Sequence, residues 1–234
     1  MQTIHLSFPK ESQMRELFDT ISPRYDLFNS VSSLGHDHAW RKKSVQLGEI
    51  TSGMTILDIG VGTGDFSGCA AEKIGSSGRI YGMDIASEML KQAAGKIKVP
   101  FLQILARAEQ IPLLTESVDR ILMAFVLRNV SDVEQTLKEC LKVLNSRGKL
   151  IILEITRPAN RAVKRFYRFY MGKIVPQIGR ILCGERWPFD YLNQSVMTFQ
   201  SPEEIADRMK RVGFHRTQVF PLTMGVVHVI IGEK

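Results

Sequence analysis

Three glycines spaced by single residues, Gly60, Gly62 and Gly64, form the stretch of this sequence best suited to bind a charged ligand. Glycine has no Cβ, so the backbone can turn tightly here and approach a ligand closely. The residues from Asp65 onward have a helical pattern, and the start of a helix offers free N–H groups and a positive dipole end. The loop is therefore predicted to bind a nucleotide-like cofactor.

Two acidic residues accompany this glycine loop. Asp58 lies in the apolar strand before it, and Asp84 ends the next predicted strand. Asp84 follows the glycine loop by roughly twenty residues, the spacing at which an acid binds the ribose hydroxyls in βαβ units. We expect Asp84 to bind the ribose, with a cap of the following helix as the alternative role. We expect Asp58 to organise the loop rather than to ionise in catalysis.

The spacing of the glycines separates two classes of cofactor. A dinucleotide fingerprint needs G-x-G-x-x-G, but Asp65 or Ser67 stands where the third glycine should be. The pattern Asp-x-Gly-x-Gly-x-Gly instead resembles the first motif of the class I S-adenosylmethionine (AdoMet) methyltransferases. The ligand of that class carries an amino acid in place of a pyrophosphate, so an acid near its ammonium group makes electrostatic sense.

Strands and helices alternate around these residues. The predicted strands are 54–59, 79–84, 101–105, 118–125, 148–155, 215–220 and 225–231. The predicted helices of this part are 65–75, 87–97, 131–144 and 202–212. The alternation favours a doubly wound parallel sheet, while the four residues between the last two strands are too few for a crossover and indicate an antiparallel hairpin. The predicted fold class is α/β, a seven-stranded class I AdoMet methyltransferase sheet.

Two regions depart from the alternation. Near the N-terminus, 11–20 and 36–50 have helical character, and Pro23 is expected to keep 21–26 out of a helix. The connection 157–201 is far longer than usual. We predict one methyltransferase domain with four parts: an N-terminal helical cap (1–50), an AdoMet-binding core (51–156), a helical substrate-cap insert (157–201), and a C-terminal helix and hairpin (202–234).

The insert interleaves basic and aromatic side chains at helical spacing. Its basic residues are Arg161, Lys164, Arg165, Arg168 and Lys173, and its aromatic residues are Phe166, Tyr167, Phe169 and Tyr170. Such a helix can lie on a membrane surface or roof a pocket for a large apolar substrate. A packed helix with a solvated basic face is the plainer alternative. We expect peripheral membrane contact through 161–173.

Composition narrows the class of protein. The chain has 234 residues, 44% of them hydrophobic and 24% charged, as in an ordinary globular domain. It has no apolar run long enough to span a bilayer, and its first ten residues lack the apolar core of a signal peptide. Its three cysteines, Cys69, Cys140 and Cys183, are scattered, which suggests neither a disulfide framework nor a metal site. We expect a cytoplasmic protein without a metal.

The net charge of +7 could attract nucleic acid or an anionic membrane. Much of it is concentrated in the insert rather than spread as a nucleic-acid-binding stripe. A nucleic-acid amino-methyltransferase commonly has an Asn-Pro-Pro-Tyr type motif after the fourth strand, where residues 124–127 read Ala-Phe-Val-Leu. We therefore expect no nucleic-acid partner. A nicotinamide oxidoreductase is disfavoured by the glycine spacing and the hairpin, and a non-catalytic AdoMet-binding module has no feature in its favour.

Polar residues follow the fourth predicted strand, at the sheet edge where ligands bind in α/β folds. Arg128 and Asn129 stand there. A guanidinium beside a phenolic oxygen would stabilise the phenolate by charge and hydrogen bonding. Arg128 could instead pair with Asp132, and Asn129 could cap the next helix, for which Ser131 is an equally good candidate.

Motifs along the chain carry a more specific resemblance. They lie at 18–29, 33–36, 39–42, 127–132, 153–158, 175–179, 191–195 and 225–227. Together they span nearly the whole chain and resemble the C-methyltransferases of ubiquinone and menaquinone biosynthesis. The resemblance implies AdoMet-dependent methylation of a ring carbon on a prenylated quinol, with S-adenosyl-L-homocysteine as the second product. It favours 2-demethylmenaquinol as substrate and leaves a ubiquinone precursor, dual specificity and a homodimer open.

The same resemblance assigns cofactor contacts to positions of this chain. They are Thr63 in the glycine loop, Asp84, the pair Arg107 and Ala108 after the third strand, and Ala124 after the fourth. Some relatives have Asn in place of Arg107 and Ser in place of Ala124. Ala124 can offer only backbone atoms, so a side-chain hydrogen bond is lost there.

The predicted catalytic residues are Arg128, Asn129 and Tyr25. A phenol has a pKa near 10, so the site must favour the phenolate, and Arg128 is placed to do so. Because arginine is a poor base, the resemblance suggests that proton removal passes through a water held by Arg128. Asn129 would orient a water or the second oxygen, and Tyr25 would cover the substrate, unless Tyr25 is an ordinary core residue. His36 and His38 are expected at the surface or as caps.

Overall fold

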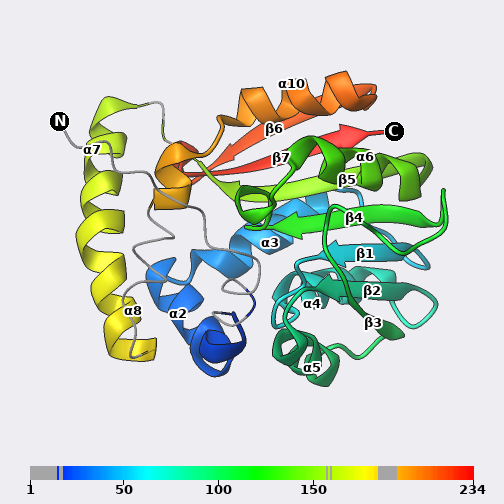
Figure 1. Cartoon of the computed structure of the whole chain (residues 1–234), viewed down its shortest axis with the longest axis horizontal. Coiled ribbons are helices and arrows are strands. Elements are labelled where there is room, and N and C mark those ends of the chain that lie inside the picture. Colours follow the sequence, from blue (N-terminus) through cyan, green and yellow to red (C-terminus); the bar gives the residue numbers. More distant parts are fainter. Residues whose placement is uncertain (1–14, 16–17, 157, 159, 184–193) are drawn as a thin grey trace.

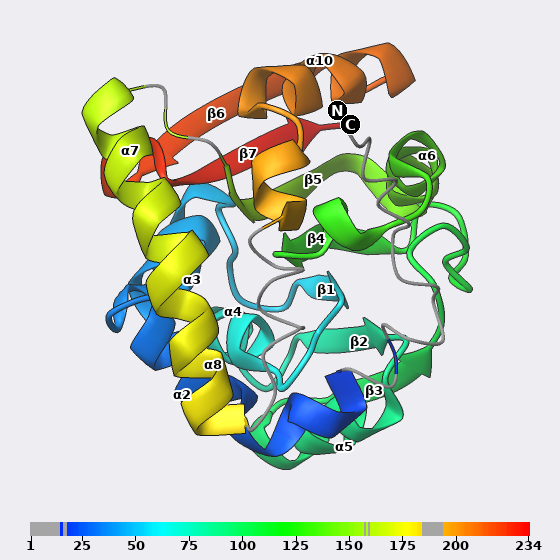
Figure 2. The same ribbon diagram turned by 60° about the vertical axis from the view of Figure 1, so that its left-hand side comes forward.

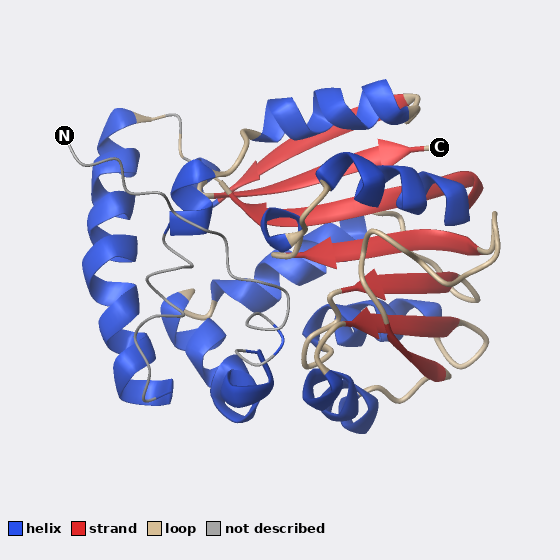
Figure 3. Cartoon of the chain, viewed as in Figure 1, coloured by secondary structure: helices blue, strands red, loops and turns tan. Residues whose placement is uncertain are grey.

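The computed structural model describes residues 15, 18–156, 158, 160–183 and 194–234. Within them one sheet has seven strands in the order β3-β2-β1-β4-β5-β7-β6. The strands are β1 (Thr55–Ile59), β2 (Arg79–Asp84), β3 (Phe101–Leu105), β4 (Val118–Ala124), β5 (Leu144–Ile155), β6 (Arg216–Leu222) and β7 (Val227–Glu233). The first five strands pair in parallel, and β7 is antiparallel to β5 and β6 (Figures 1 and 3). The predicted parallel sheet with a terminal hairpin is confirmed.

The largest differences from the predicted strand boundaries are at the start of β5 and at the turn of the hairpin. β5 begins at Leu144, because Leu144 still pairs with Val118 before the register shifts at a bulge. The turn of the hairpin also comes later than expected, since Pro221 lies inside β6 and opposite His228. Proline cannot donate to a ladder, but β6 is the last strand of the sheet and an edge strand tolerates it.

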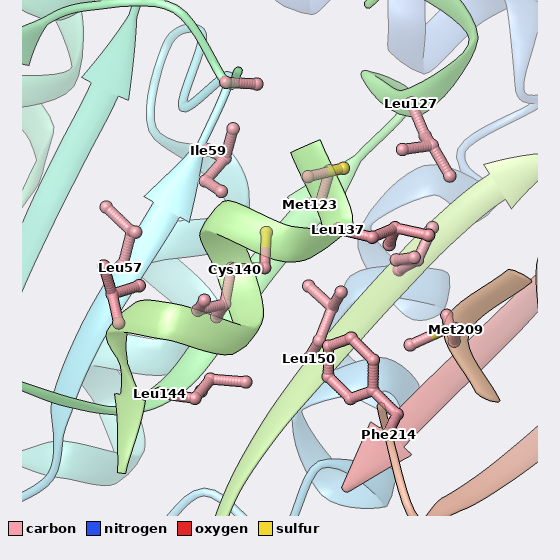
Figure 4. Packing of buried hydrophobic residues seen from close by; sticks show 14 of the residues in the cluster. Leu57, Ile59, Met123, Leu127, Leu137, Cys140, Leu144, Leu150, Met209 and Phe214 are labelled. Atoms are coloured by element: carbon pink, nitrogen blue, oxygen red, sulfur yellow. The ribbon is translucent and has the colours of Figure 1, made fainter. Parts of the chain in front are cut away.

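Helices cover both faces of the sheet. They are α3 (His36–Leu47), α4 (Asp65–Ile74), α5 (Ser87–Lys96), α6 (Val133–Val143) and α10 (Pro202–Val212). Alternate strand residues face opposite layers: Leu57 and Met123 share a buried cluster with Leu137 of α6 and Met209 of α10 (Figure 4). Ile56 belongs instead to a second buried cluster formed with α3, α4 and α5. Both faces of the central strands are therefore buried, as the apolar strand sequences predict.

The N-terminal region is more helical than predicted. Arg15 and residues 18–21 are helical, and the other residues of the predicted helix at 11–20 lie outside the described ranges. The expectation that Pro23 keeps 21–26 out of a helix was wrong. Ser22–Arg24 forms a 3-10 turn that leads directly into α2 (Tyr25–Ser32). Proline is tolerated there because the N–H groups of a first helical turn have no helical partner.

Residues 161–183 of the insert form one long helical column, and residues 194–198 form a further short helical segment. α7 (Arg161–Phe169), a π-helical turn (Tyr170–Ile174) and α8 (Val175–Cys183) follow each other without a break. α8 packs against α2 (Figure 2), and the arrowheads of β1, β2 and β4 point toward these helices (Figure 1). The insert and α2 therefore stand at the carboxyl ends of the parallel strands, where α/β folds bind ligands.

Two properties of the described residues bear on the partners that the protein could have. None of the helices there is both long and apolar enough to cross a bilayer. The same residues contain no group of three or more His, Cys, Asp or Glu side chains that could hold a metal ion.

Cys69 and Cys140 are buried free thiols, and burial raises the pKa of the Cys69 thiol to about 11. Both cysteines act as core residues, as predicted.

Candidate active site

The glycine loop has a backbone that other residues would adopt only under strain. Gly60, Gly62 and Gly64 have φ values of 64°, 54° and 90°, in the left-handed region that favours glycine. A Cβ on Gly60 would lie 2.2 Å from Val126 Cγ2, and one on Gly64 would lie 3.0 Å from the Cα of Ala93. The first and third glycines are thus required for packing as well as for conformation.

The two acids hold the loop in different ways. Asp84 accepts hydrogen bonds from Gly62 N at 2.9 Å and from Ala86 N at 3.0 Å. It therefore joins the loop to the start of α5, in addition to lining the cavity described below. Asp58 is fully buried and accepts a hydrogen bond from Ser67 Oγ of α4 at 2.6 Å. Burial raises the pKa of Asp58 to about 7, although the Ser67 hydrogen bond and Arg41 act in the opposite direction.

A cavity of about 340 Å³ lies beside the loop. Six of the predicted cofactor residues line it: Gly60, Gly62, Asp84, Arg107, Ala108 and Ala124. The other three do not. Asp58 is buried next to the loop, Gly64 precedes α4 as its N-terminal cap residue, and Thr63 donates a hydrogen bond to Asp26 of α2. These three residues support the walls of the cavity rather than lining it.

Arg107 belongs to a polar network at the rim of this cavity. Its Nη2 donates to Ser131 Oγ at 2.9 Å, and its Nε lies 3.6 Å from Glu109 Oε2. Ser131 in turn donates from its hydroxyl to Glu109 at 2.6 Å. The network ties the segment after β3 to the segment after β4. Glu109 and Ser131 were not among the predicted cofactor residues, although both line the cavity.

A second cavity, of about 390 Å³, adjoins the first. Its walls are mostly apolar and come from α2, α3, the insert and the turn between β6 and β7. Four residues line both cavities: Phe18, Tyr25, Phe125 and Asn129. The two spaces therefore meet at these side chains, so a molecule in one can touch a molecule in the other.

Arg128 lines the second cavity and forms a buried ion pair with Glu154. The side chain of Arg128 is 7% exposed and that of Glu154 is 0% exposed. Glu154 Oε1 also accepts from Ile155 N at 3.0 Å. Burial raises the pKa of Glu154, and the charge of Arg128 opposes that shift. No role was assigned to Glu154 from the sequence, although this residue lies in the motif 153–158 and is an acid near the end of an apolar strand.

The alternative roles considered for the segment after β4 are not observed. Asp132, not Asn129 or Ser131, caps α6, because its side chain accepts from Gln135 N at 2.9 Å. Arg128 pairs with Glu154 rather than with Asp132. The Asn129 side chain instead donates to the backbone oxygen of Phe125 at 3.3 Å. Arg128 and Asn129 therefore both remain at the cavity walls.

Phe125 stands between two arginines at the junction of the cavities. Its φ of 62° is left-handed, which is a strained conformation for a bulky residue. The guanidinium carbons of Arg41 and Arg128 lie 5.6 Å and 5.8 Å from the centre of its ring. Arg41 is buried and pairs with Asp37 at 2.9 Å. Arg41 was missed from sequence, where it was one of several basic residues in a helical pattern.

Tyr25 lines both cavities from the start of α2. Burial raises the pKa of Tyr25, while a hydrogen bond with Asn29 and the charge of Arg128 act to lower it. The ring of Phe18 packs edge-on against the ring of Tyr25, with 6.1 Å between the two ring centres.

His36 and His38 are both exposed, as expected, although His36 also lines the second cavity.

Comparisons with known proteins agree with this arrangement. The profile of the ubiE/COQ5 methyltransferase family matches residues 7–234. The ubiquinone/menaquinone biosynthesis C-methyltransferase UbiE of Geotalea daltonii is 38% identical over 230 residues, which cover 96% of this chain and 97% of the relative. The demethylmenaquinone methyltransferase of Bacillus cereus is 32% identical over 231 residues, with the same two coverages.

Solved structures agree on the fold. A SAM-dependent methyltransferase from Aquifex aeolicus superposes with a TM-score of 0.61 at 19% identity, covering 96% of this chain and 98% of that one. SAM is another abbreviation for AdoMet. At this identity the likeness shows a shared fold, the class I AdoMet methyltransferase fold that the sheet order and hairpin also indicate.

Proposed function

Because the chain belongs to the ubiE/COQ5 methyltransferase family, we propose that it methylates a ring carbon of a prenylated quinol, converting 2-demethylmenaquinol to menaquinol. It is an AdoMet-dependent C-methyltransferase of menaquinone or ubiquinone biosynthesis. The observation that carries the choice of substrate is the adjoining pair of cavities. One is bordered by the glycine loop, and the other is an apolar space with two buried, paired arginines, Arg41 and Arg128, in its wall.

The residues that line the first cavity suit AdoMet. Gly62 presents a backbone without a side chain to the cavity, which suits the methionine part of the ligand. The Asp84 carboxylate lines the cavity and would accept hydrogen bonds from the ribose hydroxyls, and Arg107 and Ala108, which also line it, would border the adenine. Ala124 adds a small surface at the end of β4. When bound, AdoMet supplies an electrophilic methyl group on a positively charged sulfur.

The second cavity fits the quinol ring and the start of its prenyl chain. Arg128 lines this cavity and is the neighbour of Asn129 in the chain. Its guanidinium would favour the phenolate by charge and hydrogen bonding. A water held by Arg128 takes the phenolic proton, which makes the neighbouring ring carbon nucleophilic. Overall the ring exchanges one hydrogen for a methyl group, S-adenosyl-L-homocysteine forms, and one proton is released.

Asn129 and Tyr25 act at the junction of the cavities. Asn129 lies next to the proposed phenolate site and would orient the water or the second quinol oxygen. Tyr25 separates cofactor from solvent and packs over the ring. Because burial raises its pKa, Tyr25 stays neutral and does not compete for the charge of Arg128. No metal ion takes part in this proposal, since the phenolate is stabilised by a side chain.

The mouth of the second cavity fits a membrane surface. Three large apolar side chains that line it are strongly exposed: Leu34 (75%), Phe166 (67%) and Met224 (78%). The basic residues of the insert, Arg161, Lys164, Arg165, Arg168 and Lys173, are exposed beside them. Apolar side chains flanked by cations suit an anionic lipid surface. The protein would then work at the inner face of the membrane and take its prenylated substrate from the bilayer.

A deletion strain complemented by this chain tests the proposed function. Mass spectrometry of its quinones should show that demethylmenaquinone is consumed and menaquinone appears. Persistence of demethylmenaquinone would contradict the assignment. A purified-enzyme assay with AdoMet and either quinol precursor then separates the menaquinone branch from the ubiquinone branch and from dual specificity.

A further inference from the structure

Five residues in or next to the second cavity have a buried polar side-chain atom without a hydrogen-bond partner among the described residues, and two of these atoms are Asn29 Nδ2 and Arg41 Nε. The other three belong to the Arg128–Glu154 ion pair or to a tyrosine on which both charges of the pair act. They are Arg128 Nε, Glu154 Oε2 and Tyr167 OH. A buried polar atom left without a partner is destabilising because its lost hydration is not replaced, and native structures contain few of them. Because Arg128 and Tyr167 line one cavity and Glu154 pairs with Arg128, a polar group bound in that cavity could supply the missing hydrogen bonds.

These atoms come from three separate parts of the chain. Arg128 follows β4, Glu154 lies near the end of β5, and Tyr167 lies in α7 of the insert. Arg128 and Tyr167 line the same cavity. Burial raises the pKa of Tyr167, the charge of Arg128 lowers it, and the charge of Glu154 raises it, so both charges act on this hydroxyl.

The charge balance of the ion pair explains what a further donor would add. Glu154 offsets part of the positive charge of Arg128, so a further hydrogen-bond donor beside the pair adds to the stabilisation that Arg128 gives an incoming phenolate. A neutral hydroxyl beside the pair adds a donor without adding a charge. Tyr167 is suited to this because its ring is fixed by packing with Phe28, Met171 and Val175, which leaves the hydroxyl as its only polar group.

We propose that Tyr167 is a further catalytic residue, whose hydroxyl donates a hydrogen bond to the same quinol oxygen that Arg128 binds. The inference rests on the proposed quinol methylation. It assigns to the insert a direct part in stabilising the phenolate, beyond roofing the pocket. Glu154 acts through Arg128, which it holds in place, and is a positioning residue.

Tyr167→Phe tests the proposal by removing only the hydroxyl. Loss of a hydrogen bond to a charged oxygen should lower kcat/KM for 2-demethylmenaquinol by about 10- to 100-fold. The KM for AdoMet should not change. Because the hydroxyl has no partner among the described residues, the melting temperature should stay the same or rise. A hydroxyl with a structural role would instead lower the melting temperature and leave kcat/KM intact.

The pH profile of kcat gives a second readout. Removing a donor to the phenolate raises the pKa of the bound quinol, so the acidic limb of the profile should move to higher pH in Tyr167→Phe. A structural defect would scale the rate without moving that limb. Tyr81→Phe is the matched control, because Tyr81 lies in β2, packs on the core and lines neither cavity.

The outcomes separate the two levels of inference. If the wild-type enzyme fails to methylate demethylmenaquinol, the proposed function fails. If the wild-type enzyme is active and Tyr167→Phe keeps its kcat/KM, the role of Tyr167 is overturned while the function stands. A lower kcat/KM with an unmoved acidic limb also overturns it. A lower kcat/KM with a shifted limb and an unchanged or higher melting temperature supports it.

Discussion

The two cavities of this protein are built in different ways. The cavity proposed for the cofactor, called the cofactor cavity below, is shaped largely by backbone: three left-handed glycines, the ends of β1, β2 and β4, and an aspartate that binds backbone N–H groups. The cavity proposed for the substrate, called the substrate cavity below, is shaped by side chains from α2, α3, the insert and the ends of β4 and β5. The first can be recognised in a short stretch of sequence. The second exists only once distant segments have packed together.

This difference predicts which substitutions impair each cavity, and whether binding or catalysis is lost. A backbone-built site should lose binding when a Cβ is added, whereas a side-chain-built site should lose catalysis when a functional group is removed. Four substitutions, from the largest expected effect to the smallest, test this contrast.

Arg128→Ala should have the largest effect, a loss of about a thousandfold or more in kcat for quinol methylation. It removes the phenolate-stabilising charge and leaves Glu154 buried without its partner, which costs about 3–5 kcal/mol of stability. AdoMet affinity, measured by calorimetry on the folded variant, should change little. Arg128→Lys is the control, because it keeps the charge and loses the planar fork. Near-normal methylation by Arg128→Ala would show that the assigned role is wrong.

Gly60→Ala should weaken AdoMet binding by about 10- to 100-fold. The added Cβ meets Val126 Cγ2 at 2.2 Å, and the φ of 64° is unfavourable for alanine. Gly95→Ala is the matched control, since Gly95 lies in α5 and a Cβ there meets no atom within 4 Å. That control should bind AdoMet normally and be slightly more stable. Equal affinities for the two variants would argue against a backbone-built site.

Asp58→Asn should change how stability depends on pH. Burial raises the pKa of Asp58 in the folded state to about 7 from an ordinary value of 3.8, so between those values the folded protein binds the extra proton. The contribution of Asp58 to the free energy of unfolding therefore falls as pH rises between these two values, by at most about 1.4 kcal/mol per pH unit. Urea unfolding at several pH values should give a flatter profile for the variant. An unchanged slope would mean that Asp58 ionises normally.

Phe166→Ser should have the smallest effect, about a fivefold loss of binding to vesicles that contain anionic lipid. It removes one apolar side chain from the rim of the substrate cavity. Leu114→Ser is the control, because Leu114 is even more exposed, at 82%, and lines neither cavity. Equal binding by both variants would contradict membrane contact at this rim. A loss of dimer in sedimentation, without a loss of vesicle binding, would assign the rim to a homodimer instead.

Much of the core fold could be predicted from local patterns. Apolar strands, the alternation with helices and the short last connection led to the observed seven-stranded sheet with a hairpin. The failures were also local. Pro23 was taken as a break, but it starts the turn that leads into α2, and Pro221 was placed in the turn but lies in an edge strand. In both cases the effect of proline depends on whether its missing N–H would have had a partner.

The glycine loop, and with it the class of cofactor, could be read from the chain alone, because a few consecutive residues set that backbone. The motifs after the fourth strand likewise named Arg128. The partners of Arg128 could not be read in this way. Glu154 reaches it because β5 lies beside β4, and Tyr167 shares its cavity because the insert folds back over the strand ends. Contacts between distant segments depend on how whole layers pack, and no local pattern records that.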